Sequence, residues 1–340
     1  MPAGYDGCLW RTRVAGGAPG KAPGAIACPR SYPSYERACA RARPVTENGT
    51  VTSAIEQPET PAARRRAAAV TPRLIATDLD GTLLHDDKTV SDRTVAALAA
   101  AEEAGIEVFF VTGRPARWMD VVSEHVHGHG LAICANGAVV ADLRDGGRLL
   151  EVRPLETVAA LTVVRAVRAA APGASFAVEC STGLHYEPHY PPFQLDSATV
   201  VPSAEALLTG TDGRPGAIIK LLAFHPELGP DEFLALARTA AGDHGCVTRS
   251  SPTALLEISG AGVSKASTLA RCCAERGISP EEVVAFGDMP NDLEMLTWAG
   301  TSYAMANAHP EVLAACTHRT AANTEDGVAL VIEQLLHGLT

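Results

Sequence analysis

Apolar and polar positions change their spacing near residue 73, where short apolar runs begin to alternate with segments of helical period. The runs at 73–78 and 106–114 are mostly apolar, as buried strands are. Between them, the segment 91–105 is rich in alanine and leucine; Ser91 can cap a helix there and Gly105 can end it. Strands that alternate with helices are typical of a parallel α/β sheet, so we predict one from this point onwards.

The pattern continues with a third strand expected over 131–140, after a segment at 116–126 that we expect to be helical. From about 155 to 256 the strand-like runs show more alternation and more turns, which favours an antiparallel α+β arrangement. After residue 262 the alternation of helices and apolar strands returns. The pattern therefore predicts one α/β domain that is interrupted by a smaller, inserted domain.

We place the two parts of the α/β domain at 71–154 and 259–340, and the inserted domain at 155–258. Residues 1–70 differ from both, because they are rich in Ala, Gly, Pro and Arg and show no sustained period. They carry ten Lys and Arg against five Asp and Glu. We expect a disordered extension or the product of a wrongly chosen start codon. A basic docking or targeting arm around 63–69 is the alternative.

The composition argues against several classes of protein. The 340 residues carry a formal net charge of -11, which argues against general binding to nucleic acid or to anionic membranes. No apolar run is long enough for a transmembrane helix, and the first residues lack the apolar core of a signal peptide. The 9 cysteines show no paired metal-binding spacing, so reduced thiols in a cytoplasmic protein are expected. Nothing in the sequence indicates an obligate protein partner.

Four short stretches carry polar residues where an apolar run ends or a helix begins: 78–82, 111–114, 262–265 and 287–292. In an open parallel sheet the carboxyl ends of the strands line one crevice, and ligands bind there. Residues that are far apart in sequence can therefore converge at this edge.

The residue types in these stretches suggest phosphate chemistry. Hard oxygen ligands that suit Mg²⁺ come from four carboxylates: Asp78, Asp80, Asp288 and Asp292. Groups that can bind an anion come from Thr112, Gly113, Ser264 and Lys265. One carboxylate can attack phosphorus while a second handles a proton, and phosphoryl transfer needs mainly positioning and charge neutralisation.

The four stretches, in this order, resemble the motifs of the haloacid dehalogenase (HAD) superfamily of phosphatases. The large insert, with Asn136-Gly137-Ala138 before it, resembles the Cof-type branch, subfamily IIB, with a type 2B cap. The resemblance covers about 73–336. It implies a Rossmann-like parallel-sheet core with an inserted α+β cap domain.

The resemblance also implies roles for single residues. Asp78 would be the nucleophile and a Mg²⁺ ligand, and Asp80 the general acid/base, with its backbone carbonyl on the metal. Asp288 would bind Mg²⁺ and Asp292 would support the metal site. The phosphate contacts would come from the Leu79 backbone, Thr112, Gly113, Lys265 and Asn291. Candidates for substrate contact are Arg114, Asn136, His185 and Tyr186, although Asn136-Gly137 could equally be a simple turn between strands.

The expected function is hydrolysis of a small phosphorylated metabolite, a sugar phosphate or a similar phosphomonoester, with Mg²⁺ and through an aspartyl phosphate. One alternative is a phosphomutase or other phosphotransferase on the same core. A second is a non-enzymatic regulator that binds a phosphorylated ligand. The intact set of Asp78, Asp80, Lys265 and Asp288 argues against a pure binder, which has no need of a nucleophile.

Overall fold

The structure is a computed structural model that describes residues 71–123, 130–191, 198–210, 216–250 and 253–339. The predicted extension at 1–70 lies outside the described residues. Two sheets organise the described part of the chain, one of eight strands and one of six. We call the eight-stranded sheet with its helices the core, and the six-stranded sheet with its helices the cap.

The core sheet has the strand order β14-β13-β12-β1-β2-β3-β4-β5. All pairs from β14 to β3 are parallel, and β4 and β5 add an antiparallel edge. The strands span Leu74–Thr77 (β1), Glu107–Val111 (β2), Leu131–Cys134 (β3), Val139–Asp142 (β4), Arg148–Val152 (β5), Val283–Gly287 (β12), Thr301–Ala304 (β13) and His318–Arg319 (β14). Strands β1 and β12 lie side by side at the centre, so their carboxyl ends meet.

The single strand expected over 131–140 is wrong, because the chain reverses at Ala135–Gly137 and continues as the antiparallel partner β4. Asn136 and Gly137 have φ values of 54° and 98°, a left-handed conformation that asparagine and glycine tolerate best. A side chain on Gly137 would come within 2.2 Å of the Ser264 carbonyl oxygen. The sequence pattern misses this turn, because the strands on both sides of it are buried and form one apolar run.

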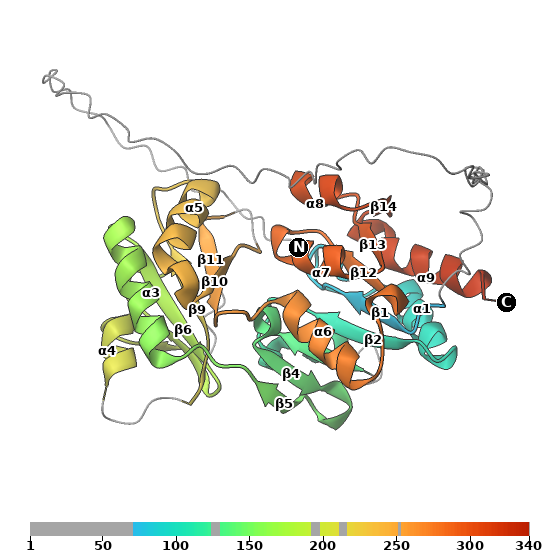
Figure 1. Ribbon diagram of the computed structural model, residues 1–340, viewed down its shortest axis with the longest axis horizontal. Coiled ribbons are helices and arrows are strands. Elements are labelled where there is room, and N and C mark those ends of the chain that lie inside the picture. The colour runs from blue at the N-terminus through green and yellow to red at the C-terminus, as the bar shows by residue number, and fades with distance from the viewer. Residues whose placement is uncertain (1–70, 124–129, 192–197, 211–215, 251–252, 340) are drawn as a thin grey trace, which may run out of the picture. The chain divides into compact units, whose positions relative to one another are not determined.

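Helices cover the core sheet. They are α1 (Asp92–Glu103), α2 (Asp120–Ser123), α6 (Lys265–Glu275), α7 (Leu293–Trp298), α8 (Pro310–Ala315) and α9 (Gly327–His337). Helix α1 packs against α9, and α6 against α7 (Figure 1). Ser91 caps α1 by accepting a hydrogen bond from the Thr94 amide, as the sequence predicts.

The cap sheet has the order β10-β11-β9-β6-β7-β8 and is antiparallel except between β7 and β8. Its strands span Ser175–Cys180 (β6), Gly183–Tyr186 (β7), Thr199–Val200 (β8), Ile218–Phe224 (β9), Cys246–Thr248 (β10) and Leu255–Ser259 (β11). The cap helices are α3 (Thr157–Ala170), α4 (Ala204–Thr209) and α5 (Pro230–Ala241), and α3 lies beside α5 (Figure 1).

Core and cap each bury an apolar cluster of their own. In the cap, alternate residues of β9 and β11, such as Leu221 and Ile258, join the cluster under the helices, and the intervening residues face the other way. The predicted fold class, a parallel-sheet α/β core with an inserted α+β domain, is confirmed. Among the described residues, no helix has both the length and the apolar character needed to cross a membrane.

Candidate active site

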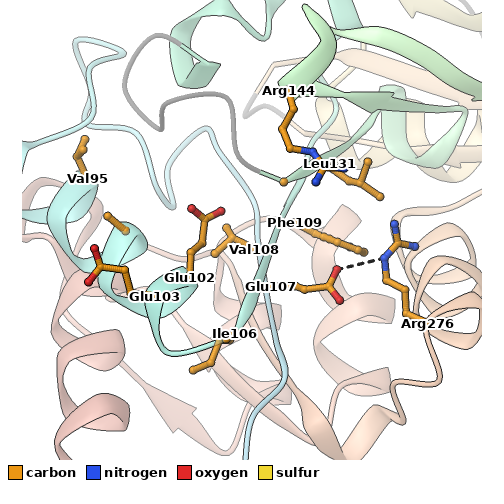
Figure 2. Close-up of a pocket in the computed structure, with 13 residues that line it drawn as sticks. Val95, Glu102, Glu103, Ile106, Glu107, Val108, Phe109, Leu131, Arg144 and Arg276 are labelled. Atoms are coloured by element: carbon orange, nitrogen blue, oxygen red, sulfur yellow. Dashed lines mark hydrogen bonds and ion pairs between the residues drawn. The ribbon is translucent and has the colours of Figure 1, made fainter.

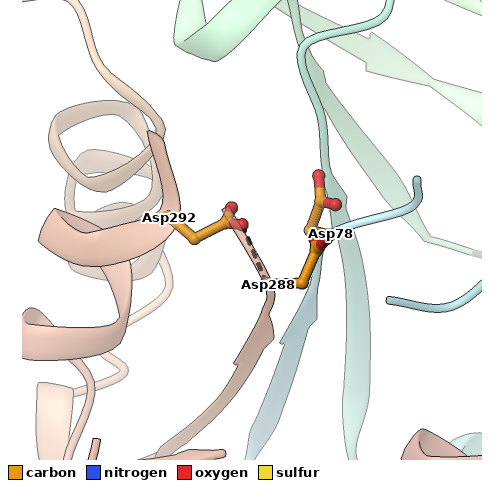
Figure 3. A group of neighbouring side chains, drawn as sticks. All are labelled: Asp78, Asp288 and Asp292. Carbon is orange, nitrogen blue, oxygen red and sulfur yellow. Dashed lines mark hydrogen bonds between the residues drawn. The ribbon is translucent and has the colours of Figure 1, made fainter. Parts of the chain in front are cut away.

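Three acidic side chains meet at the carboxyl ends of the two central strands. Asp78 follows β1 and Asp288 follows β12, while Asp292 comes from the short turn before α7 (Figure 3). One carboxylate oxygen from each lies within 4.8 Å of the others, and all three residues are buried. The parallel pairing of β1 and β12 therefore brings together residues that are 210 positions apart.

Lys265 sits between two of these carboxylates. It is the first residue of α6, where Ser264 serves as the N-cap. Its Nζ lies 2.6 Å from Asp78 Oδ1 and 2.7 Å from Asp292 Oδ1, and the residue is only 1% exposed. Burial alone would lower the pKa of Lys265, but Asp292 and Asp78 raise it above its ordinary value. The lysine is therefore held as a cation that orients Asp78.

Burial and the closeness of the three carboxylates raise the free energy of their ionised forms. Burial and the neighbouring Asp292 raise the pKa of Asp288 to about 7, against the hydrogen bond that Thr82 Oγ1 donates to it at 3.0 Å. Burial also raises the pKa of Asp78 well above its ordinary value, although Lys265 opposes the rise. A divalent cation favours the ionised forms, and oxygen donors are what Mg²⁺ prefers. The donor set therefore fits such an ion.

Glycines allow the acidic groups to approach the backbone. Gly81 has φ +80°, and a side chain there would come within 2.3 Å of Asp288 Oδ2. Gly287 similarly leaves room for Asp292, whose Oδ2 accepts the amides of Asp288 at 3.1 Å and Met289 at 3.0 Å. These contacts fix the loop after β12 around the Asp292 side chain.

Asp80 turns away from the three carboxylates. Its oxygens accept two hydrogen bonds from Arg114, at 2.6 and 2.7 Å, and one from Lys88 at 2.8 Å. Burial would raise the pKa of Asp80, but the hydrogen bonds from Arg114 and Lys88 lower it to about 2. Asp78 and Asp80 thus have different surroundings, and Asp80 is held in its ionised form. Between them, the Leu79 carbonyl accepts the amides of residues 82–84, which turns the chain back after β1.

The remaining predicted phosphate contacts lie around this cluster. Thr112 and Gly113 follow β2, and Thr112 Oγ1 accepts the Arg114 amide at 3.1 Å. Asn291 Nδ2 donates to Asn136 Oδ1 at 3.1 Å. Asn136 is thus both part of the turn between β3 and β4 and a neighbour of the predicted phosphate site.

A cavity of about 460 Å³ lies between this edge of the core and the cap. Its core wall includes Asp78, Asp80, Arg114, Asp288 and Asn291. Its cap wall includes apolar side chains (Leu184, Tyr190, Leu222 and Leu255), three charged ones (Glu179, Lys220 and Glu257) and Ser250. Within the described residues, the wall does not include His185 or Tyr186, two of the predicted substrate contacts; their neighbours Leu184 and Tyr190 line it instead.

A second cavity, of about 830 Å³, lies at the other end of the core strands. Figure 2 shows it beside Glu107 and Leu131, which lie in the amino-terminal halves of β2 and β3. Arg276 forms an ion pair with Glu107 at 3.1 Å in its wall and covers the ring of Phe109. The three carboxylates lie at the opposite ends of the strands, so this cavity is separate from the site.

The three charged cap residues were not predicted. Glu179 lies in β6, Lys220 in β9 and Glu257 in β11, each a single charge within a mostly apolar strand. Lys220 pairs with Glu257 at 3.1 Å, and Arg117 of the core pairs with Glu179. A buried charge needs a partner, so a lone charge in an apolar strand is the sequence signal that could have identified them.

The family model for haloacid dehalogenase-like hydrolases matches residues 75–332. The chain belongs to this family. The prediction made from the four motifs is thereby confirmed. Three of the motifs lie at the carboxyl ends of β1, β2 and β12, and the fourth leads into α6.

Several relatives of this hydrolase are phosphatases. A 5-amino-6-(5-phospho-D-ribitylamino)uracil phosphatase from Bacillus subtilis is 30% identical over 77% of this chain and 97% of the relative. A pyridoxal phosphate phosphatase from Escherichia coli is 31% identical over 77% of this chain and 98% of the relative. A solved haloacid dehalogenase-like hydrolase from B. subtilis superposes with a TM-score of 0.68 at 26% identity, covering 77% of this chain and 99% of that one.

Proposed function

We propose that the protein is a Mg²⁺-dependent phosphatase of small phosphorylated metabolites that works through an aspartyl phosphate on Asp78. The observation that carries the proposal is the buried Asp78 carboxylate, which Lys265 orients beside Asp288 and Asp292. The phosphatase relatives support the reaction class. A cytoplasmic location stays a prediction from the sequence.

Asp78, Asp288 and Asp292 would hold or support the metal, together with the backbone carbonyl of Asp80. When bound, Mg²⁺ supplies positive charge that offsets the charges of phosphate and carboxylates. Lys265 and Asn291 would contact the phosphate oxygens, and so would Thr112 and Gly113 after β2.

In the first step, an Asp78 oxygen attacks phosphorus, the bond from phosphorus to the ester oxygen breaks, and this leaving oxygen takes a proton from Asp80. In the second step, water attacks the same phosphorus, the bond to Asp78 breaks, and Asp80 accepts the proton of the water. Arg114 and Lys88 hold Asp80 ionised in the arrangement seen here, so Asp80 has to leave these contacts before it can carry the proton of either step.

The cavity argues for a leaving group with an apolar face. Leu184, Tyr190, Leu222 and Leu255 would pack against it, and about 460 Å³ accommodates a compact metabolite. A sugar or a flat ring system fits this description.

The test is phosphate release from a panel of phosphomonoesters with Mg²⁺ and with EDTA, for the native chain and for Asp78→Asn. Asparagine keeps the shape and an acceptor for Lys265 but is not a nucleophile, so the variant should fold and show no turnover. Full activity in Asp78→Asn would exclude the mechanism. Phosphate release that depends on an added sugar acceptor would indicate a phosphotransferase instead.

A further inference from the structure

A buried ion pair joins two otherwise apolar strands on the cavity-facing side of the cap sheet. Lys220 in β9 and Glu257 in β11 are exposed by only 4% and 6% and pair at 3.1 Å. Removing two charges from water costs several kcal/mol per ion, and an apolar pair often stabilises a fold equally well. Stability of the cap alone therefore does not explain this pair.

Both side chains reach across the cavity to the core. Lys220 Nζ donates to the Gly113 carbonyl oxygen at 2.8 Å, and Glu257 accepts a hydrogen bond from Asn136 Nδ2. A side chain on Gly113 would lie only 3.2 Å from Glu257 Oε2. The glycine after β2 therefore lets the cap carboxylate approach the turn that is predicted to bind phosphate.

Through Asn136, Glu257 also affects the orientation of the Asn291 amide. An ionised carboxylate only accepts hydrogen bonds, so Glu257 determines that the amide nitrogen of Asn136 faces the cap. Asn136 Oδ1 is then directed to Asn291 Nδ2, at 3.1 Å. Asn291 Oδ1 is buried and has no hydrogen-bond partner among the described residues, so the bond to Asn136 is what orients this amide.

The polar atoms of the pair are occupied by protein groups. Lys220 Nζ contacts the Gly113 carbonyl and Glu257, and Glu257 also accepts from Ser250 Oγ at 2.6 Å. The cap surface that stays open to a leaving group is therefore mainly apolar. This separates the pair from the residues that would select the substrate.

We propose that Lys220 and Glu257 are positioning residues for the phosphate site. Seated on the core, they hold the Gly113 turn and the Asn136–Asn291 amide pair in the arrangement that binds a phosphate group. The cap would thus complete phosphate binding as well as enclose the leaving group. This inference rests on the proposed function, because it assumes that Gly113 and Asn291 contact phosphate.

The test measures inorganic phosphate, which has no leaving group. Its dissociation constant is determined by calorimetric titration in the presence of Mg²⁺ for the native chain, Lys220→Met and Glu257→Gln. We expect each variant to bind phosphate about tenfold more weakly, equivalent to about 1.4 kcal/mol. We also expect kcat/KM for glycerol phosphate and for p-nitrophenyl phosphate to fall by similar factors.

Glu179→Gln is the matched control, because Glu179 is a buried carboxylate of the same cap wall that pairs with Arg117 and not with Asn136. Its phosphate affinity should stay within about twofold of the native value. The combination of Asn136→Ala with Glu257→Gln should cost no more than the larger single change, because both act on one path. If a single variant does not fold, Lys220→Met combined with Glu257→Leu removes both charges together.

Unchanged phosphate affinity in Lys220→Met and Glu257→Gln, with losses only for p-nitrophenyl phosphate, would assign the pair to leaving-group recognition and overturn the proposal. An equal loss of phosphate affinity in Glu179→Gln would show that the effect comes from docking of the cap as a whole. The specific role of Lys220 and Glu257 would then be overturned. If the native chain binds phosphate but hydrolyses no ester, the proposed function fails while the positioning role is still measured by the titration.

Discussion

Replacement of Asp288 by asparagine should stabilise the metal-free protein while removing its response to Mg²⁺. Asparagine has nearly the same shape and keeps an oxygen that can accept the hydrogen bond from Thr82. It also removes one of three buried negative charges whose oxygens lie within 4.8 Å. The variant thus loses a predicted metal ligand and is relieved of electrostatic repulsion between the buried carboxylates.

The magnitude follows from the pKa of Asp288, which rises from an ordinary 3.8 to about 7. The folded chain then binds a proton between about pH 4 and pH 7 that the unfolded chain releases, so stability falls as pH rises through this window. Three pKa units at about 1.4 kcal/mol each set an upper limit of about 4 kcal/mol above pH 7. Because the site is open to the cavity, we expect the free energy of unfolding of Asp288→Asn to exceed that of the native chain by about 2 kcal/mol.

Urea unfolding of both proteins in EDTA, between pH 5 and pH 8, measures the effect. The advantage of Asp288→Asn should grow with pH and level off above pH 7, and added Mg²⁺ should stabilise only the native chain. Asp243→Asn, at an exposed position of the cap, controls for the loss of one charge. A variant that is less stable than the native chain in EDTA at pH 8 would refute the reasoning, as would equal stabilisation of both proteins by Mg²⁺.

Four further outcomes test the site. Lys265→Met leaves two buried carboxylates without their cation, so urea unfolding should show a loss of about 3–5 kcal/mol at pH 8. Gly81→Ala places a carbon against Asp288 Oδ2, so the Mg²⁺ concentration for half-maximal activity should rise at least about tenfold. Arg114→Leu removes a group that lowers the pKa of Asp80, so the acidic limb of the kcat/KM profile should move to higher pH. EDTA should abolish phosphate release, and excess Mg²⁺ should restore it.

The sequence predicted the alternation of strands and helices well, because buried parallel strands and amphipathic helices have different periods. It failed at 131–152, where β3, the turn at Asn136 and the edge strands β4 and β5 follow one another. Strands buried on both faces read as one apolar run, and β5 is exposed enough to lack a clear pattern. The antiparallel edge of the core sheet therefore needed the tertiary structure.

Sequence alone determined the family and the residue types of the site, because the motifs that end at Thr82, Arg114, Lys265 and Asp292 are local and ordered along the chain. Only the tertiary structure decided which groups touch. It pairs Asp80 with Arg114 rather than with the acidic cluster, and it brings Lys220 and Glu257 of the cap to Gly113 and Asn136 of the core. Contacts of this kind depend on the register of the strands and on the position of the cap on the core. Neither can be predicted from a local sequence pattern.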